Sequence, residues 1–350
     1  MTRPAVDWDL ARRRAASLVR PGPKVDRRQA AELVDSIRAA AHRSPELVGE
    51  VTGLTEAAER AGRGPVYVID RPRWAEGNLQ MFRHLLGDTL PEPKVPGGAR
   101  VAGEELGAVL SLLASRVLGQ FDPFTPNPGG AGRLVVVAPN VLHVQRELAL
   151  DAGDFHLWVC LHEQTHALQF AAAPWLAEHL QTSMTELMTT LMREKDAGDR
   201  MRGLLEVLPR ILRGSDGPAS ASSGAALLGA VLTEEEQEVM GRSVAVMSLL
   251  EGHADVVMDD VGPKVVPTVR RIRAAFEVRR AGHGLFDTVL RRLLGMDSKL
   301  AQYREGASFV RGVTERCGHE GLNAVWAEPA NLPSGEEIAD PGAWVRRVHG

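Results

Sequence analysis

The stretch 159–170 constrains the fold most, because it places the pattern His-Glu-x-x-His inside an apolar run. On an α-helix, residues four apart lie on one face. His162 and His166 can therefore point at one metal ion, with Glu163 beside them. In a zinc hydrolase of this kind, two imidazoles bind the metal and the carboxylate takes the proton of a metal-bound water.

The residues around this pattern predict a long central helix. Asp154 is a suitable N-cap, and residues 155–170 contain neither Gly nor Pro. Apolar side chains occupy nearly all sides of the segment, which indicates a helix in the core. The alternative is a pair of hydrogen-bonded core histidines. Buried His and Glu side chains are costly unless they are paired or bound to metal, and we favour the metal site.

A second motif, at residues 250–255, supplies candidates for a third ligand. Glu251 and Asp255 are four apart and share a helix face, in the Glu-x-x-x-Asp arrangement of the gluzincins. There the Glu binds zinc, and the Asp accepts a hydrogen bond from the far ring nitrogen of the first His, here His162. His253 is the alternative third ligand, or a hydrogen-bond donor to substrate. Either carboxylate could instead be an ordinary ion-paired or exposed acid.

These residue types predict a mechanism. Zn²⁺ held by His162, His166 and Glu251 keeps one coordination position for water, and Glu163 moves the proton from that water to the leaving amine. A tetrahedral oxyanion needs a further donor besides the metal. The candidates for that role are His253, Tyr303 and Arg304. Weaker metal-ligand candidates are Asp259 and Asp260.

Composition excludes several classes of partner. The chain has 350 residues, of which 44% are apolar and 25% charged, as in an ordinary globular protein. The net charge of −4 gives no support to a nucleic-acid partner. Two cysteines cannot form a Cys-rich metal site, and no apolar run is long enough to span a bilayer. With no apolar signal segment at the N-terminus, we expect a soluble cytoplasmic protein without a membrane partner.

The pattern along the chain predicts a mainly α fold with a small β-sheet, of the α+β class. We expect one domain over residues 1–350, with an N-terminal helical portion at about 1–120 and a metal-site core at about 133–315. The best strand is 134–138, which fits an edge strand beside the active site and plain core equally well. Two separate helices are expected at 26–41 and 44–54. Residues 121–132 are expected to form a loop, and 214–224 a mobile one.

Motifs along the chain include VDW at 6–8, LVRPGP at 18–23, VTGL at 51–54, VAPN at 137–140, HEQTH at 162–166, EGHAD at 251–255, GMDSKLAQY at 295–303 and DPGAW at 340–344. In these motifs the chain resembles a known family over almost its whole length, namely the actinobacterial zincin-like metallohydrolases, and in particular their coenzyme F-420 biosynthesis-associated branch. The resemblance implies a mostly helical zincin domain with a small sheet, and it implies no substrate.

Two functions from different classes remain. The first is a zinc-dependent metallopeptidase or amidohydrolase that acts on a peptide or amide substrate. The second is a non-catalytic zinc-binding accessory protein of deazaflavin coenzyme biosynthesis. Glu163 favours the enzyme, because a structural site closes its fourth position and has no use for a base.

Overall fold

The computed structural model describes residues 4–87, 90, 93, 95–126, 132–193, 234–281 and 301–350. These residues form a mainly helical fold with one three-stranded sheet, which confirms the predicted class. No helix among them is both long and apolar enough to cross a membrane. The loop prediction at 214–224 lies outside the described residues.

The chain divides into two compact units, Met1–Ala177 with Val257–Ala275, and Glu178–Val256 with Phe276–Gly350. The boundaries differ from those of the expected helical portion and metal-site core, and the expectation of a single domain stays a prediction. The elements up to the end of the first long segment are α1 (Trp8–Leu18), α2 (Arg27–Thr52), α3 (Thr55–Gly62), β1 (Val66–Ile69), α4 (Arg71–Leu86), α5 (Gly98–Leu113), β2 (Gly119–Asp122), β3 (Arg133–Val137), α6 (Ala138–Glu147) and α7 (Ala152–Ala172).

The sheet has the strand order β1-β3-β2, with β1 parallel and β2 antiparallel to β3. β3 is therefore the central strand, and four of its five residues are buried. The edge-strand role that β3 could have had is excluded, and its role as core is confirmed. β2 forms one edge of the sheet, in a segment where we expected a loop from residue 121 onward.

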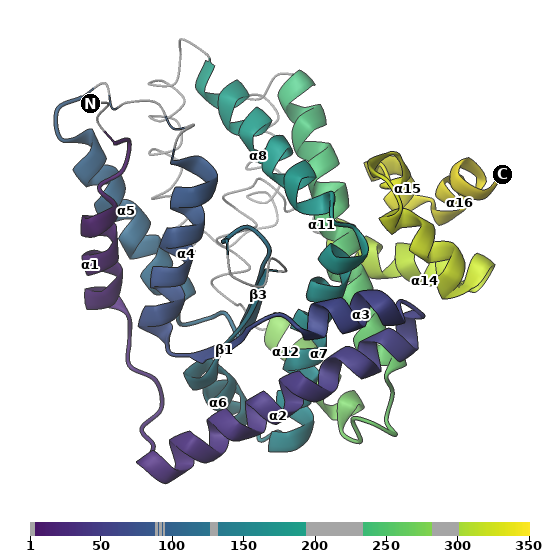
Figure 1. Ribbon diagram of the computed structural model, residues 1–350, viewed down its shortest axis with the longest axis horizontal. Helices are drawn as coiled ribbons and strands as arrows, with labels where there is room; N and C mark the ends of the chain where they lie inside the picture. Colours follow the sequence, from purple (N-terminus) through teal and green to yellow (C-terminus); the bar gives the residue numbers. More distant parts are fainter. Residues whose placement is uncertain are drawn as a thin grey trace. The chain divides into compact units, whose positions relative to one another are not determined.

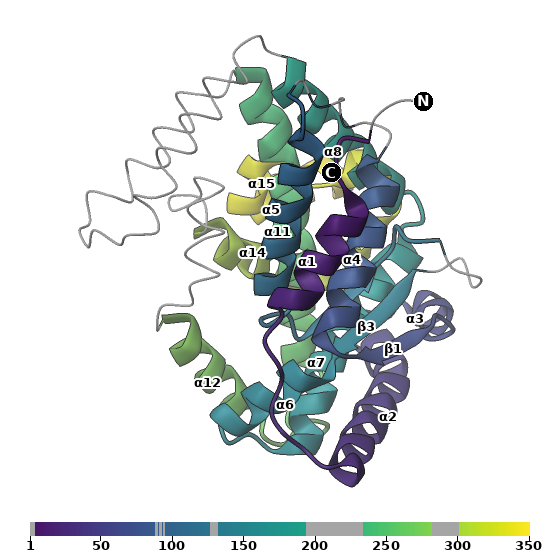
Figure 2. The same ribbon diagram turned by 90° about the vertical axis from the view of Figure 1, so that its left-hand side faces the viewer.

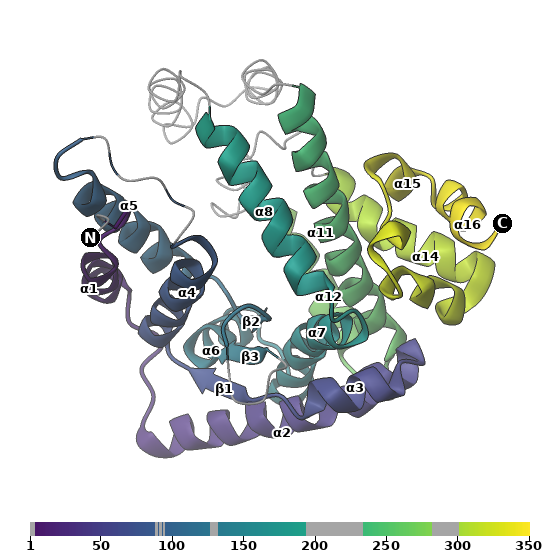
Figure 3. The ribbon, with the colours of Figure 1, turned by 45° about the horizontal axis from the view of Figure 1, so that its top comes forward.

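Helices cover both faces of the sheet. On one face, Val135 and Val137 pack with Trp74 of α4 and with α1 and α5, and Figure 1 shows these three helices side by side. Figure 2 shows the end of α4 beside β1 and β3. On the other face, α7 contacts β2 and β3, and Figure 3 shows α2 passing the sheet and running along α7.

α2 is one helix, where the sequence predicted two, at 26–41 and 44–54. Its N-terminus is a full capping box of Asp26 and Gln29, and it continues through Pro45. Proline in a helix interior loses a backbone hydrogen bond and normally ends or kinks the helix. Here the buried side of α2, which includes Ile37 and Val48, packs along α7 and α3, and this packing outweighs the local preference.

The second unit is helical in its described residues. Its terminal helices α14, α15 and α16 pack against one another and are drawn in yellow-green and yellow in Figure 1. Two helices, α11 and α12, run from one unit into the other. The elements from residue 176 onward are α8 (Leu176–Arg193), α11 (Glu234–Asp260), α12 (Val269–Ala281), α14 (Ala301–Leu322), the 3-10 turns η1 (Asn323–Trp326) and η2 (Pro329–Asn331), α15 (Gly335–Ala339) and α16 (Pro341–His349).

Candidate metal centre

The helix predicted around His-Glu-x-x-His is α7, and it begins three residues earlier than expected. Asp151 is the N-cap, and its carboxylate accepts a hydrogen bond from the Asp154 backbone amide. Asp154 lies in the first turn. Its carboxylate accepts hydrogen bonds from the Thr268 amide at 2.7 Å and from the Thr268 hydroxyl at 2.6 Å. The residue that we predicted as the N-cap of this helix therefore anchors the segment just before α12.

α7 is buried on nearly every side, as predicted. From 155 to 169 every residue is buried except His162 and His166, which are half-buried. The two histidines are four apart, so they define the one face of this segment that reaches accessible space. A metal held there could keep a coordination position for a substrate or for water.

The two imidazoles converge through their Nε2 atoms, which lie 3.2 Å apart. Each ring has an acceptor at its other nitrogen. Gln169 Oε1 lies 2.9 Å from His166 Nδ1, and Met258 Sδ lies 3.2 Å from His162 Nδ1. An acceptor at Nδ1 favours the tautomer with the proton on Nδ1, which leaves the lone pairs on the two Nε2 atoms.

This arrangement fits a metal ion. Two nitrogen lone pairs at this distance repel each other unless a cation or a proton lies between them. Two nitrogens bound tetrahedrally to zinc at about 2.0–2.1 Å stand about 3.3 Å apart. The observed separation of 3.2 Å between His162 Nε2 and His166 Nε2 is close to that value.

Glu163 is 6% exposed and lies against β2. A Cβ atom at Gly119 would stand 2.6 Å from Glu163 Cγ and 2.7 Å from its Oε1, so only glycine fits there without a shift. Burial, and to a lesser extent the Glu163 charge, raises the pKa of the neighbouring Cys160. That thiol stays protonated, and it is not a nucleophile.

Sequence reasoning missed three residues of this site: Gln169, Met258 and Gly119. Gln169 is fully buried, three residues after His166, and a polar residue there in an apolar helix was a readable signal. Met258 and Gly119 gave no such signal, because their roles depend on how α11 and β2 pack against α7.

The second motif lies on α11, in the second unit. Glu251, Asp255 and Asp259 are half-buried and spaced four residues apart, so these three acids share one helix face. Asp259, a weaker ligand candidate that lies in the first unit, forms an ion pair with Arg273 at 2.7 Å, and Asp260 is exposed.

His253 and Gly252 belong to the interior of the second unit. His253 is fully buried, with its ring centroid 5.3 Å from that of Trp326. A Cβ atom at Gly252 would collide with the backbone of Gly306 on α14, so the glycine of this motif allows α11 and α14 to touch. Tyr303 and Arg304 are at the start of α14, and their side chains lie outside the described set.

The chain has matches among known proteins. The profile of the zincin-like metallopeptidases matches residues 6–345. The chain belongs to this family. A crystal structure from Chloroflexus aurantiacus, described as a "putative hydrolase with a novel fold", is 30% identical to this zincin-like chain, with a TM-score of 0.67 over 98% of each chain. No curated protein matches the chain. The family implies a bound metal, typically zinc.

Proposed function

We propose that this zincin-like protein is a zinc-dependent hydrolase of peptide or amide bonds. The observation that carries the proposal is the pair of imidazoles that face each other through Nε2, on the one face of residues 155–169 that is not fully buried. The family membership and the hydrolase description of the Chloroflexus protein support the same reaction class.

Glu251 is our candidate for the third ligand. Its place in the Glu-x-x-x-Asp motif of a chain that also carries His162 and His166 supports this assignment. Glu251 also stands seven residues before Met258 on α11, so the two share a helix face, and Met258 contacts His162. Two imidazoles and one carboxylate are a ligand set that catalytic zinc sites use.

The bound zinc and the residues around it would then have separate roles in the hydrolysis. When bound, zinc polarises a carbonyl and lowers the pKa of water toward neutrality. The Glu163 carboxylate takes a proton from the attacking water and returns it to the leaving amine. Gln169 holds His166 by its Nδ1–H, so that Nε2 stays available as a ligand. At His162 Nδ1 the contact is Met258 Sδ, and we propose that Asp255 also helps to orient this ring.

β2 is our candidate for the strand that binds substrate. It forms an edge of the sheet and carries Gly119, which touches Glu163. An extended peptide can add to a sheet edge through main-chain hydrogen bonds, which favours a peptide over a small amide. The sequence suggested residues 134–138 as an edge strand beside the active site. We now propose residues 119–122 for that role.

The test compares wild type with Glu163→Gln on peptide libraries and on small amides. The amide of Gln cannot accept the proton, so the variant should keep its zinc and lose activity by roughly 10²–10⁴-fold. Zinc content measured on the same samples controls for loss of the metal. If wild type never exceeds Glu163→Gln on any substrate, while a partner protein or coenzyme precursor binds both, the accessory function replaces this proposal.

A further inference from the structure

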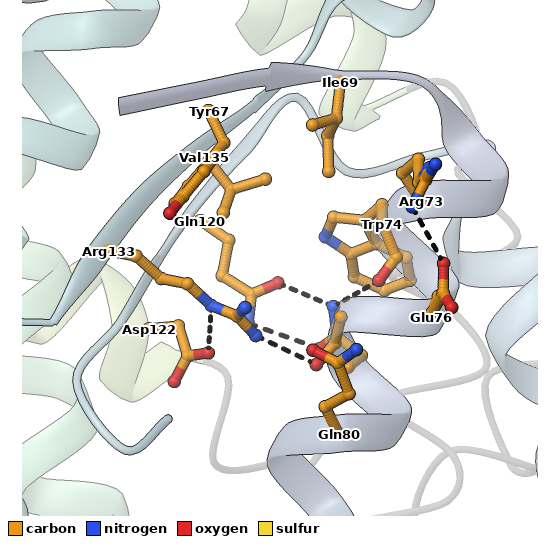
Figure 4. Close-up of a pocket in the computed structure, with 12 residues that line it drawn as sticks. Tyr67, Ile69, Arg73, Trp74, Glu76, Gln80, Gln120, Asp122, Arg133 and Val135 are labelled. Carbon is orange, nitrogen blue, oxygen red and sulfur yellow. Dashed lines mark hydrogen bonds and ion pairs between the residues drawn. The ribbon is translucent and has the colours of Figure 1, made fainter. Parts of the chain in front are cut away.

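A pocket of about 310 Å³ lies between α4 and the face of the sheet opposite α7. Figure 4 shows Val135, Ile69 and Gln120 on the sheet side and Trp74 on the helix side. Gln120 pairs with Val135 in the β2–β3 register, so their side chains share one face. Gly119 and Phe121 point to the other face, toward α7. The pocket is therefore separate from the candidate metal centre.

Most polar groups in the walls satisfy one another. Asn78 and Gln120 exchange two amide hydrogen bonds, at 3.1 and 3.2 Å. Arg133 donates to Asp122 at 2.8 Å and to the Gly77 carbonyl at 3.1 Å. These groups close one end of the pocket without needing a ligand.

Trp74, in contrast to these paired groups, has a buried polar atom that no described residue satisfies. Its side chain is buried, with 4% of the residue exposed, and its indole Nε1 has no hydrogen-bond partner among the described residues. In Figure 4 the indole nitrogen faces the middle of the pocket, while the ring lies along its wall. Buried polar groups nearly always have a partner, and an indole N–H can only donate. A ligand in this pocket would therefore present an acceptor oxygen to Trp74.

Two more polar groups line the rim of the pocket, the Arg73 guanidinium and the Tyr67 hydroxyl. Arg73 is largely exposed, and the one ion pair of its side chain among the described residues is a 3.5 Å contact to Glu76, so its guanidinium can turn toward an anion. Tyr67, 45% exposed, lies across the opening from it. Ile69 and Val135 offer an apolar surface for a short carbon chain. Together these groups suit a small molecule with one carboxylate and a short apolar part.

We propose that this pocket is a second binding site, for a small organic carboxylate of about the size of an acylated amino acid. Its carbonyl or carboxylate oxygen accepts the Trp74 Nε1–H hydrogen bond, and Arg73 faces the carboxylate. The site acts independently of the metal, since it lies on the opposite face of the sheet from Glu163.

N-acetylglycine is the probe, and n-butylammonium is the comparison without an acceptor. The six tryptophan indole N–H signals are followed by ¹⁵N NMR, and Trp74→Phe identifies the Trp74 signal by its loss. N-acetylglycine should shift this signal in a saturable way, and n-butylammonium should not. Isothermal titration should show roughly 10-fold weaker binding to Trp74→Phe, which keeps a ring but loses the donor.

Trp344→Phe is the matched control, because the Trp344 indole already donates to the Asn331 carbonyl. The titration is repeated after zinc removal with EDTA, and the Trp74 shift should be unchanged. The proposal is overturned if the Trp74 signal does not move, moves without saturation, or needs zinc. A water that occupies the site and is not displaced by the probe also overturns it. If Trp74→Phe does not fold, the comparison of the two probes on wild type decides.

Discussion

Gly119 of β2 leaves the space that Glu163 of α7 fills: a methyl group on Gly119 would stand 2.6 Å from Glu163 Cγ. The sheet edge and the candidate general base therefore fit together only because residue 119 has no side chain. Since Glu163 is almost fully buried, it has little room to move aside.

Gly119→Ala should displace the Glu163 carboxylate while leaving the metal ligands in place. We expect kcat/KM to fall on the order of 10²-fold, because displacements of about 1 Å have such effects, and zinc content to stay at the wild-type level. The control is Gly153→Ala on α7, where the new Cβ would meet only Asp151 Oδ1 at 3.6 Å. Wild-type activity in Gly119→Ala would show that the position of Glu163 does not matter.

Gln169→Leu should weaken zinc binding by roughly 10–100-fold, because His166 loses the acceptor that fixes its tautomer. A competition titration with a zinc chelator measures the affinity. Gln164→Leu is matched in chemistry and lies on the same helix, also buried, with no partner for its Nε2 among the described residues. Equal affinities of the two variants would remove Gln169 from the metal site.

Gly252→Ala should force α11 away from α14, because the new Cβ would collide with the Gly306 backbone. Overpacking of this kind costs about 1–3 kcal/mol in unfolding free energy, and the shift should also weaken zinc binding through Glu251. Gly241→Ala, on the same helix with nothing near its Cβ, should be neutral or slightly stabilising. Urea unfolding and zinc titration of both variants provide the comparison.

His156 should make the fold sensitive to acid. Burial lowers the pKa of His156 to about 4, although the Asp151 charge opposes the shift, and its Nδ1 lies 2.8 Å from Ser36 Oγ. Below about pH 6.5 the unfolded chain takes up this proton while the native state stays neutral. Stability therefore falls as the pH drops toward 4, with a loss of about 2–3 kcal/mol at pH 4.5.

The measurement is urea unfolding at pH 7 and pH 4.5 in EDTA, which removes the effect of acid on metal binding. In His156→Asn the difference in unfolding free energy between the two pH values should shrink by about that amount. His143→Asn, at an exposed position on α6, should behave like wild type. An unchanged difference in His156→Asn would assign the acid sensitivity to other groups.

The helical class, the small sheet and the buried α7 could be predicted because each depends on local pattern. Periodicity and the absence of Gly and Pro marked α7, and β-branched residues marked β3. The errors arose where distant packing decides. Nothing in Gly119–Asp122 marks a strand until β3 is beside it, and α2 passes Pro45 because its buried face is held by α7.

In the candidate metal centre too, local pattern predicts some features and distant packing decides others. The pairing of His162 with His166 follows from helix geometry alone. The contacts at their Nδ1 atoms do not: one comes from Met258, almost a hundred residues away on α11. The predicted roles of Glu251, Asp255, His253 and Tyr303 stay predictions.

The most direct test of the account is a crystal structure of the zinc-loaded protein, with the ion located by anomalous scattering at the zinc edge. We expect one zinc per chain, at about 2.0–2.2 Å from His162 Nε2, His166 Nε2 and a Glu251 carboxylate oxygen, with one position held by water near Glu163. A zinc ion elsewhere, or one closed off by a fourth protein ligand, would contradict it.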